Sequence, residues 1–174
     1  VFDHFPNEMQ LYSRNDIDTA YVKIDGRIKN GSFKKLKVIF SIDNKPFRVF
    51  ESVDSLFEFS IPIKAQLKQY GFQAWAFNDK DSVKVNQANK VLCGDAFIIY
   101  GQSNALSYPK YWILNDSISR DFARNFTYFK DNYHTYDGWH EFTYPDDIGT
   151  LGKWFAKAII EKTGIPVLFM NAAV

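Results

Sequence analysis

Five consecutive residues, Tyr100-Gly101-Gln102-Ser103-Asn104, carry the clearest chemistry in the sequence. They end an apolar run that begins at Ala96, and open α/β sheets place their sites at the carboxyl ends of strands. A serine hydroxyl exposed there could act as a nucleophile, and its backbone N–H would point toward a developing oxyanion. Gln102 or Asn104 could hold the turn. The same residue types also build ordinary strand-to-loop turns, so spacing alone leaves both interpretations open.

The elements around this turn predict part of a parallel sheet. The run Asp95–Tyr100 is nearly continuous in apolar residues, which is typical of a strand buried on both faces. A second apolar run, Ile165–Met170, follows a predicted helix that Gly164 would cap. One apolar stripe of that helix is formed by Leu151, Trp154, Phe155, Ala158 and Ile159. Strand, helix and strand in this order predict a βαβ unit, while the segment from Ser107 to Ile148 shows little periodicity.

The first 90 residues show a different pattern, which is typical of a small antiparallel sandwich. Short alternations of apolar and polar residues recur between turn signals such as Asp43-Asn44. Before them, Leu11 and Tyr12 would extend against the sheet, and Arg14 would be a surface charge. The predicted strands are Ala20–Ile28, Leu36–Ile42, Pro46–Phe50, Leu56–Ile63, Gly71–Phe77 and Ser82–Val85. We therefore predict a β-sandwich accessory module over residues 1–90 and the beginning of an α/β domain over residues 91–174.

Two sequence blocks resemble the sialate O-acetylesterase-like carbohydrate esterases of the SGNH hydrolase superfamily. Residues 94–105 resemble that family's first signature block, which has an acidic start, an apolar strand and then Gly-Gln-Ser-Asn. Residues 149–174 are similar to its next helix and strand, with a Trp-Phe-Ala helix and a Thr-Gly-x-Pro-Val link. A less specific stretch, Phe5–Asn15, is similar to one that precedes β modules in secreted relatives.

This resemblance implies that Ser103 is the nucleophile of an acetyl-ester hydrolase that forms an acyl-enzyme. Gly101, Gln102 and Asn104 would support the turn and the oxyanion site, and no metal or organic cofactor is implied. The implied fold is mixed: an N-terminal antiparallel β-sandwich module, then the first βαβ part of a truncated SGNH-type α/β/α domain. The family's general base lies in a later Asp-x-x-His motif. We therefore expect an N-terminal fragment, inactive alone, whose catalytic domain continues after Val174.

Histidines within the chain offer an alternative base. Ser103 with His140 and Asp137 stays open as a triad because triads are recognised by geometry rather than by order. A solvated loop histidine is the commoner case. His134 and His140 are six residues apart and do not share a helical face, so the sequence predicts no metal site.

Aromatic residues crowd the segment that contains these histidines. Tyr136 and Trp139, together with His140, are candidates for contacts to a sugar, because aromatic faces suit the apolar side of sugar rings. The alternative is that these rings pack the segment onto the body of the domain.

Composition excludes several classes of partner. The chain has 174 residues, 46% hydrophobic and 24% charged, with a net charge of +1. Residues 1–90 carry 14 basic and 11 acidic side chains and the remainder 7 and 9, so neither part has the basic excess of a nucleic-acid binder. No run of 18 apolar residues predicts a membrane span. The single cysteine, Cys93, excludes an internal disulfide framework.

The sequence thus predicts a serine-dependent carbohydrate O-acetylesterase that acts on acetylated sugars. The resemblance implies a secreted or periplasmic protein. The alternative is a non-catalytic carbohydrate-binding or structural module with an inert Gly-Gln-Ser-Asn turn. We also expect an unpaired strand edge at Val167–Met170 and poor solubility of the isolated chain.

Overall fold

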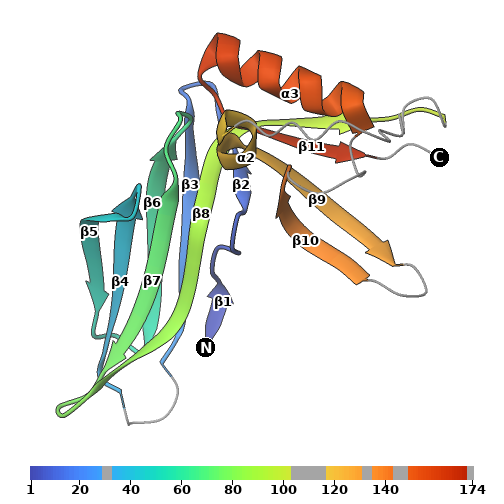
Figure 1. Cartoon of the computed structure of the whole chain (residues 1–174). Helices are drawn as coiled ribbons and strands as arrows, with labels where there is room; N and C mark the ends of the chain where they lie inside the picture. Colours follow the sequence, from blue (N-terminus) through green and yellow to red (C-terminus); the bar gives the residue numbers. More distant parts are fainter. Residues whose placement is uncertain (29–32, 103–116, 131–134, 143–148, 172–174) are drawn as a thin grey trace.

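Strands dominate the computed structural model, which describes residues 1–28, 33–102, 117–130, 135–142 and 149–171 (Figure 1). A three-stranded sheet has the order β1-β3-β6, and an eight-stranded sheet contains the path β10-β9-β11-β8-β7-β4-β5, with β2 paired to β8 beside it. The strands are β1 Phe2–His4, β2 Leu11–Ser13, β3 Thr19–Arg27, β4 Lys35–Ile42, β5 Lys45–Ser52, β6 Leu56–Lys64, β7 Tyr70–Phe77, β8 Ser82–Ile99, β9 Ala123–Lys130, β10 Thr135–Glu141 and β11 Val167–Asn171. The described helices are α2 Ser117–Phe122 and α3 Gly149–Thr163.

The two sheets pack face to face and enclose one apolar core. Side chains from β3 and β6 of the small sheet meet side chains from β4, β7 and β8 of the large sheet. Along β7, Phe72 and Ala74 are fully buried, whereas Gln73 and Trp75 between them are only half-buried. This period of two is the pattern predicted from the sequence, because successive side chains of a strand point to opposite faces. The structure therefore confirms a mixed, β-rich fold with an antiparallel sandwich.

Strand β8 connects the sandwich to the rest of the chain. Residues 82–91 pair with β7, residues 92–94 with β2, and residues 95–99 with β11. The separate strands predicted at Ser82–Val85 and Asp95–Tyr100 are therefore one continuous strand. Lys90, at the predicted domain boundary, has a positive φ of 53°. The division into domains at residues 90 and 91 stays a prediction, and β8 runs through it.

The C-terminal part contains the predicted βαβ unit. Strand β11 runs parallel to β8, with Val167 opposite Asp95, and α3 precedes β11. The expected cap of α3 is present: Gly164 has a φ of +70°, and its N–H donates to the carbonyl of Ile160 at 2.8 Å. The expected free edge at Val167–Met170 is wrong, because β9 pairs in parallel with β11 on its other side over Val167–Phe169.

Helix α3 presents a different face to the sheet from the one predicted. Its buried residues are Gly152, Ala156 and Ile160, which are spaced four residues apart, and the adjacent Lys153. The predicted stripe is largely open, with Leu151 64% exposed and both Trp154 and Phe155 51% exposed. Ala156 and Ile160 pack in one core with Val167 and Phe169 of β11. The sequence prediction chose the buried face by hydrophobicity alone and therefore selected the bulky residues. Of these, Phe155 still packs against Phe169, with an edge-to-face geometry and a centroid distance of 5.8 Å.

The segment predicted to lack periodicity contains a hairpin. Strands β9 and β10 are antiparallel, with Trp139 opposite Phe126 and His140 opposite Asn125. Figure 1 shows this hairpin turning away from the ends of β8 and β11, in agreement with the end of the β9–β11 pairing at Phe169. The sequence signal was weak because the strands alternate poorly in polarity. Across the described ranges, no helix has the length and apolar character needed to span a membrane.

Gly94 allows β8 and the connection before β11 to lie unusually close together. A Cβ at this position would lie 1.9 Å from the carbonyl oxygen of Pro166. The same carbonyl accepts a hydrogen bond of 3.0 Å from the N–H of Asp95. Any side chain at residue 94 would therefore separate the two backbones at the start of the parallel pairing.

We predict that Gly94→Ala lowers the free energy of unfolding by about 3 kcal/mol, because overpacking against backbone cannot be relieved by a rotamer change. Chemical denaturation measures this loss. Gly71→Ala is the matched control, since its Cβ would meet only the rotatable hydroxyl of Ser41 at 2.4 Å. Equal losses in the two variants would contradict the proposed close approach.

Candidate functional site

The turn predicted to carry the nucleophile, Gly101-Gln102-Ser103-Asn104, follows the carboxyl end of β8. Gly101 is half-buried and Gln102 is exposed, whereas Ser103 and Asn104 lie outside the described residues. The parallel partner β11 ends at the same edge of the sheet, with Asn171 opposite Ile99. The arrangement matches the strand-end location at which parallel sheets carry their sites.

The strand that leads into this turn is covered on one face only. Phe97 and Ile99 pack into the core that α3 covers. On the opposite face, Ile98 is 65% exposed and Tyr100 is 81% exposed. The expectation of burial on both faces is therefore wrong for this strand, because no described element covers its second face.

Arg14 fixes the start of this part of β8. Its guanidinium binds Asp95 through two hydrogen bonds, Nε to Oδ1 at 2.7 Å and Nη2 to Oδ2 at 2.9 Å, and also contacts Asp18. Its backbone N–H donates to the carbonyl of Gly94 at 2.9 Å. Hydrogen bonds from Asp95, and then from Asp18, raise the pKa of Arg14 further above its usual value. The interpretation of Arg14 as a simple surface charge is therefore wrong: it forms a bidentate pair that orients the first residue of the apolar run.

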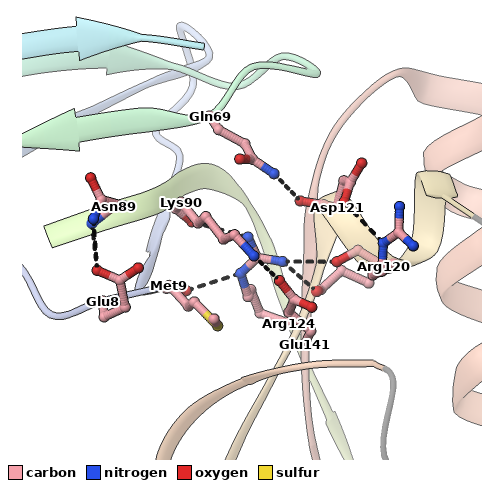
Figure 2. A network of polar contacts seen from close by, with 10 residues as sticks. Glu8, Met9, Gln69, Asn89, Lys90, Arg120, Asp121, Arg124 and Glu141 are labelled. Carbon is pink, nitrogen blue, oxygen red and sulfur yellow. Dashed lines mark hydrogen bonds and ion pairs between the residues drawn. The ribbon is translucent and has the colours of Figure 1, made fainter. Parts of the chain in front are cut away.

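A second arginine, Arg124 in β9, is completely buried (Figure 2). Its guanidinium donates to backbone carbonyls of Met9 at 3.1 Å, Lys90 at 3.0 Å and Ala123 at 2.8 Å, with a longer contact to Arg120 at 3.4 Å. These acceptors come from the N-terminal lead-in, from β8 and from the α2–β9 connection. Burial lowers the pKa of Arg124 to about 10. The sequence offered no signal for this role, since an arginine in a strand usually indicates a solvent-facing position.

Two of the carbonyls that Arg124 binds belong to residues with unusual backbone conformations. Met9 has a φ of 61° and Lys90 a φ of 53°, a region that side chains other than glycine rarely adopt. Met9 is also held by a hydrogen bond from its N–H to the carbonyl of Asn89 at 2.9 Å. The ammonium of Lys90 pairs with Glu141 of β10 at 2.5 Å. The guanidinium thus binds two backbone segments of unusual conformation, at Met9 and at Lys90 within β8, where the sandwich meets β9 and β10.

The predicted sugar contacts lie in β10. Trp139 is half-buried, stacks edge-on against Phe126 at 5.0 Å and packs near the small core of Leu11, Leu92 and Leu168. Contacts within the protein therefore cover much of the Trp139 ring surface. A contact between this ring and a sugar stays a prediction. Tyr136 lies opposite Phe129 in the hairpin.

His140 lies far from the carboxyl end of β8. The register places His140, Asn125, Phe169 and Phe97 in one row across four strands. Three strand spacings amount to about 14 Å, and the four residues from Phe97 to Gly101 add about 13 Å along the strand. A general base must approach its nucleophile to about 3 Å, so this row does not favour His140 as the base. The proposed triad also includes Ser103, which the structure does not describe.

The remaining reactive groups of the described segments are alternative candidates for a site. Cys93 is fully buried, and desolvation raises the pKa of its thiol to about 11. Within the described ranges, no group of three or more His, Cys, Asp or Glu residues could hold a metal ion. The candidate site is therefore the turn after β8, and the Arg14–Asp95 pair holds the beginning of the strand segment that leads to it.

The comparisons with known proteins support the fold. No protein family model and no curated protein sequence matches the chain. A solved structure, a carbohydrate acetylesterase from Xanthomonas citri, is similar over 99% of this chain with a TM-score of 0.53 and 20% sequence identity. The chain spans 40% of the length of that structure. At this identity, the likeness shows a shared fold.

We predict that Arg124→Met lowers the free energy of unfolding by about 3 kcal/mol or more, because buried carbonyls then lose their donor. Arg120→Met is the control: its exposed side chain pairs with Asp121, and such exposed pairs contribute about 0–1 kcal/mol. Denaturant titration compares the variants. Similar stabilities would show that Arg124 does not hold the junction.

We also predict that the thiol of Cys93 resists alkylation by iodoacetamide at pH 8 in the folded protein, since the thiolate is the reactive form. In urea it should react at the rate of a free cysteine. Because the folded pKa lies above the unfolded value, this thiol should also make the fold less stable as the pH rises from about 9 to about 11. Rapid alkylation without urea would disprove burial.

Proposed function

We propose that this chain carries the nucleophile segment of a serine-dependent carbohydrate O-acetylesterase. The observation that supports it most is the parallel pairing of β8 with β11 after α3, which places the Gly101-Gln102 turn at a carboxyl strand edge. Ser103 is the next residue in sequence. The fold likeness to a carbohydrate acetylesterase, together with the Gly-Gln-Ser-Asn signature, favours this activity over other serine chemistry. The finer relationship to sialate O-acetylesterase-like SGNH enzymes is part of this proposal.

In the proposed reaction, the hydroxyl oxygen of Ser103 attacks the carbonyl carbon of an acetyl ester. A general base takes the hydroxyl proton and returns it to the sugar oxygen as the ester C–O bond breaks. Water then attacks the acetyl-serine, which releases acetate and restores the hydroxyl. Backbone N–H groups of the turn stabilise the negative charge that develops on the carbonyl oxygen.

The general base is proposed to come from a longer parent protein. His140 is not favoured by the strand register, and a serine without a base is a weak nucleophile. Substrate contacts by Trp139, Tyr136 and His140, and secretion or periplasmic location, belong to the same proposal.

We predict that the 174-residue chain alone releases no acetate above background from 4-nitrophenyl acetate or an acetylated monosaccharide. A longer parent that includes the downstream base should release acetate. In that parent, Ser103→Ala should lower kcat by at least about 1,000-fold, as expected for loss of a covalent nucleophile.

The control is Ser107→Ala, which removes a serine hydroxyl four residues later and should leave acetate release unchanged. Full activity of the Ser103→Ala parent would refute the nucleophile assignment. Turnover by the short chain that depends on Ser103 would instead show that a base lies within residues 1–174.

A further inference from the structure

The outward face of the large sheet carries aromatic and charged side chains in an ordered array. On β4, β7 and β8 the core-facing residues alternate with residues that point away from the small sheet. No described helix crosses this face, since α2 and α3 lie beyond the other end of β8 (Figure 1). We call it the outer face, formed by Val49, Glu51, Lys35, Lys37, Ile39, Gln73, Trp75, Phe77, Lys84 and Gln87.

The centre of the outer face is an indole ring between two lysines. Strand pairing places Lys37 of β4 and Lys84 of β8 directly opposite Trp75 on either side. Phe77 is the next outward residue of β7, and the ammonium of Lys37 lies 5.3 Å from its ring centroid. Both rings are half-buried, so part of each stays open to solvent. The result is an aromatic strip with cations along its sides.

The outer face has an excess of positive charge. Glu51 of β5 binds both Lys35 at 2.5 Å and Lys37 at 2.7 Å, and the hydrogen bonds from these lysines lower the pKa of its carboxyl. Lys84 instead donates to the amide oxygen of Gln87 at 2.5 Å. Three lysines against one glutamate leave two positive charges beside the aromatic strip.

Polar groups of Trp75, Gln73 and Gln87 lie on the same face as these charges. The indole N–H of Trp75 is buried and has no acceptor among the described residues. Because this nitrogen is buried, a ligand can contact the open part of the ring but not the N–H. The neighbouring row contributes the amide side chains of Gln73 and Gln87, which lie opposite each other. Rings, amides and cations together suit a ligand with an apolar ring face, hydroxyl groups and carboxylates.

We infer that the outer face binds an acidic polysaccharide, with a sugar ring over Trp75 and a uronate carboxylate at Lys84, the lysine of this face that Glu51 does not bind. The small charge excess and the shielding of two lysines by Glu51 favour this ligand over nucleic acid, which requires a strongly basic surface. The outward residues also form rows that cross β5, β4, β7 and β8, and neighbouring strands are about 4.8 Å apart. A row of this length suits an extended polysaccharide chain. This binding does not use Ser103, so it extends the proposed esterase function without depending on it.

The test is affinity electrophoresis of the 174-residue chain in gels containing de-esterified polygalacturonic acid. The wild-type chain should be retarded, and added NaCl should weaken retardation because exposed charges are screened. Trp75→Ala should weaken affinity about fivefold to tenfold, the effect of losing one aromatic contact. Lys84→Gln should weaken it less, and Trp75→Phe should retain most of it.

Matched controls lie on the outward side of the small sheet, where Tyr21→Ala and Lys23→Gln remove an exposed ring and an exposed cation of β3. They should bind like the wild type. Absence of wild-type retardation, equal losses in the controls, or unchanged binding of both Trp75→Ala and Lys84→Gln would overturn the inference. Equal retardation by neutral hydroxyethylcellulose, or tighter binding to a thymidine oligonucleotide, would overturn the choice of ligand. Because the polymer carries no esters, none of these outcomes bears on acetyl hydrolysis.

Discussion

The buried guanidinium of Arg124 is the interaction on which the arrangement of the two parts of the chain depends. A charged group without water is tolerated only when its donors are satisfied, and here backbone carbonyls from three separate segments accept them. The same contacts hold Met9 and Lys90 in backbone conformations that cost energy elsewhere. The lead-in, β8 and the β9–β10 hairpin therefore meet at one side chain, as Figure 2 shows.

Two further constraints align the strand that precedes the proposed nucleophile. The absence of a side chain at Gly94 lets the backbone before β11 approach β8, and the Arg14–Asp95 pair holds the next residue. Both act at the beginning of the parallel pairing. These contacts align the strand that leads to the turn at Gly101, and the β8–β11 pairing continues to Ile99.

Strand β8 connects two surfaces with different chemistry. Its first half contributes Lys84 and Gln87 to the outer face, and its second half leads to the Gly101-Gln102 turn. A polysaccharide held at the outer face and an ester cleaved at the turn would engage one rigid strand at opposite ends.

The sequence by itself determined the sandwich strands and the capped helix, because these depend on local periodicity and on Gly164. The parallel β8–β11 pair followed from the order of strand, helix and strand, which favours parallel pairing. Its signature residues also located the candidate turn, through chemistry that is read from residue type. Only the tertiary structure decided which face of α3 is buried, because the packing of Ala156 and Ile160 against Val167 and Phe169 sets the orientation of the helix on the sheet. The roles of Arg14, Arg124 and the outer face likewise arise from partners up to 115 positions away in the sequence, and such distant pairings leave no periodic signal.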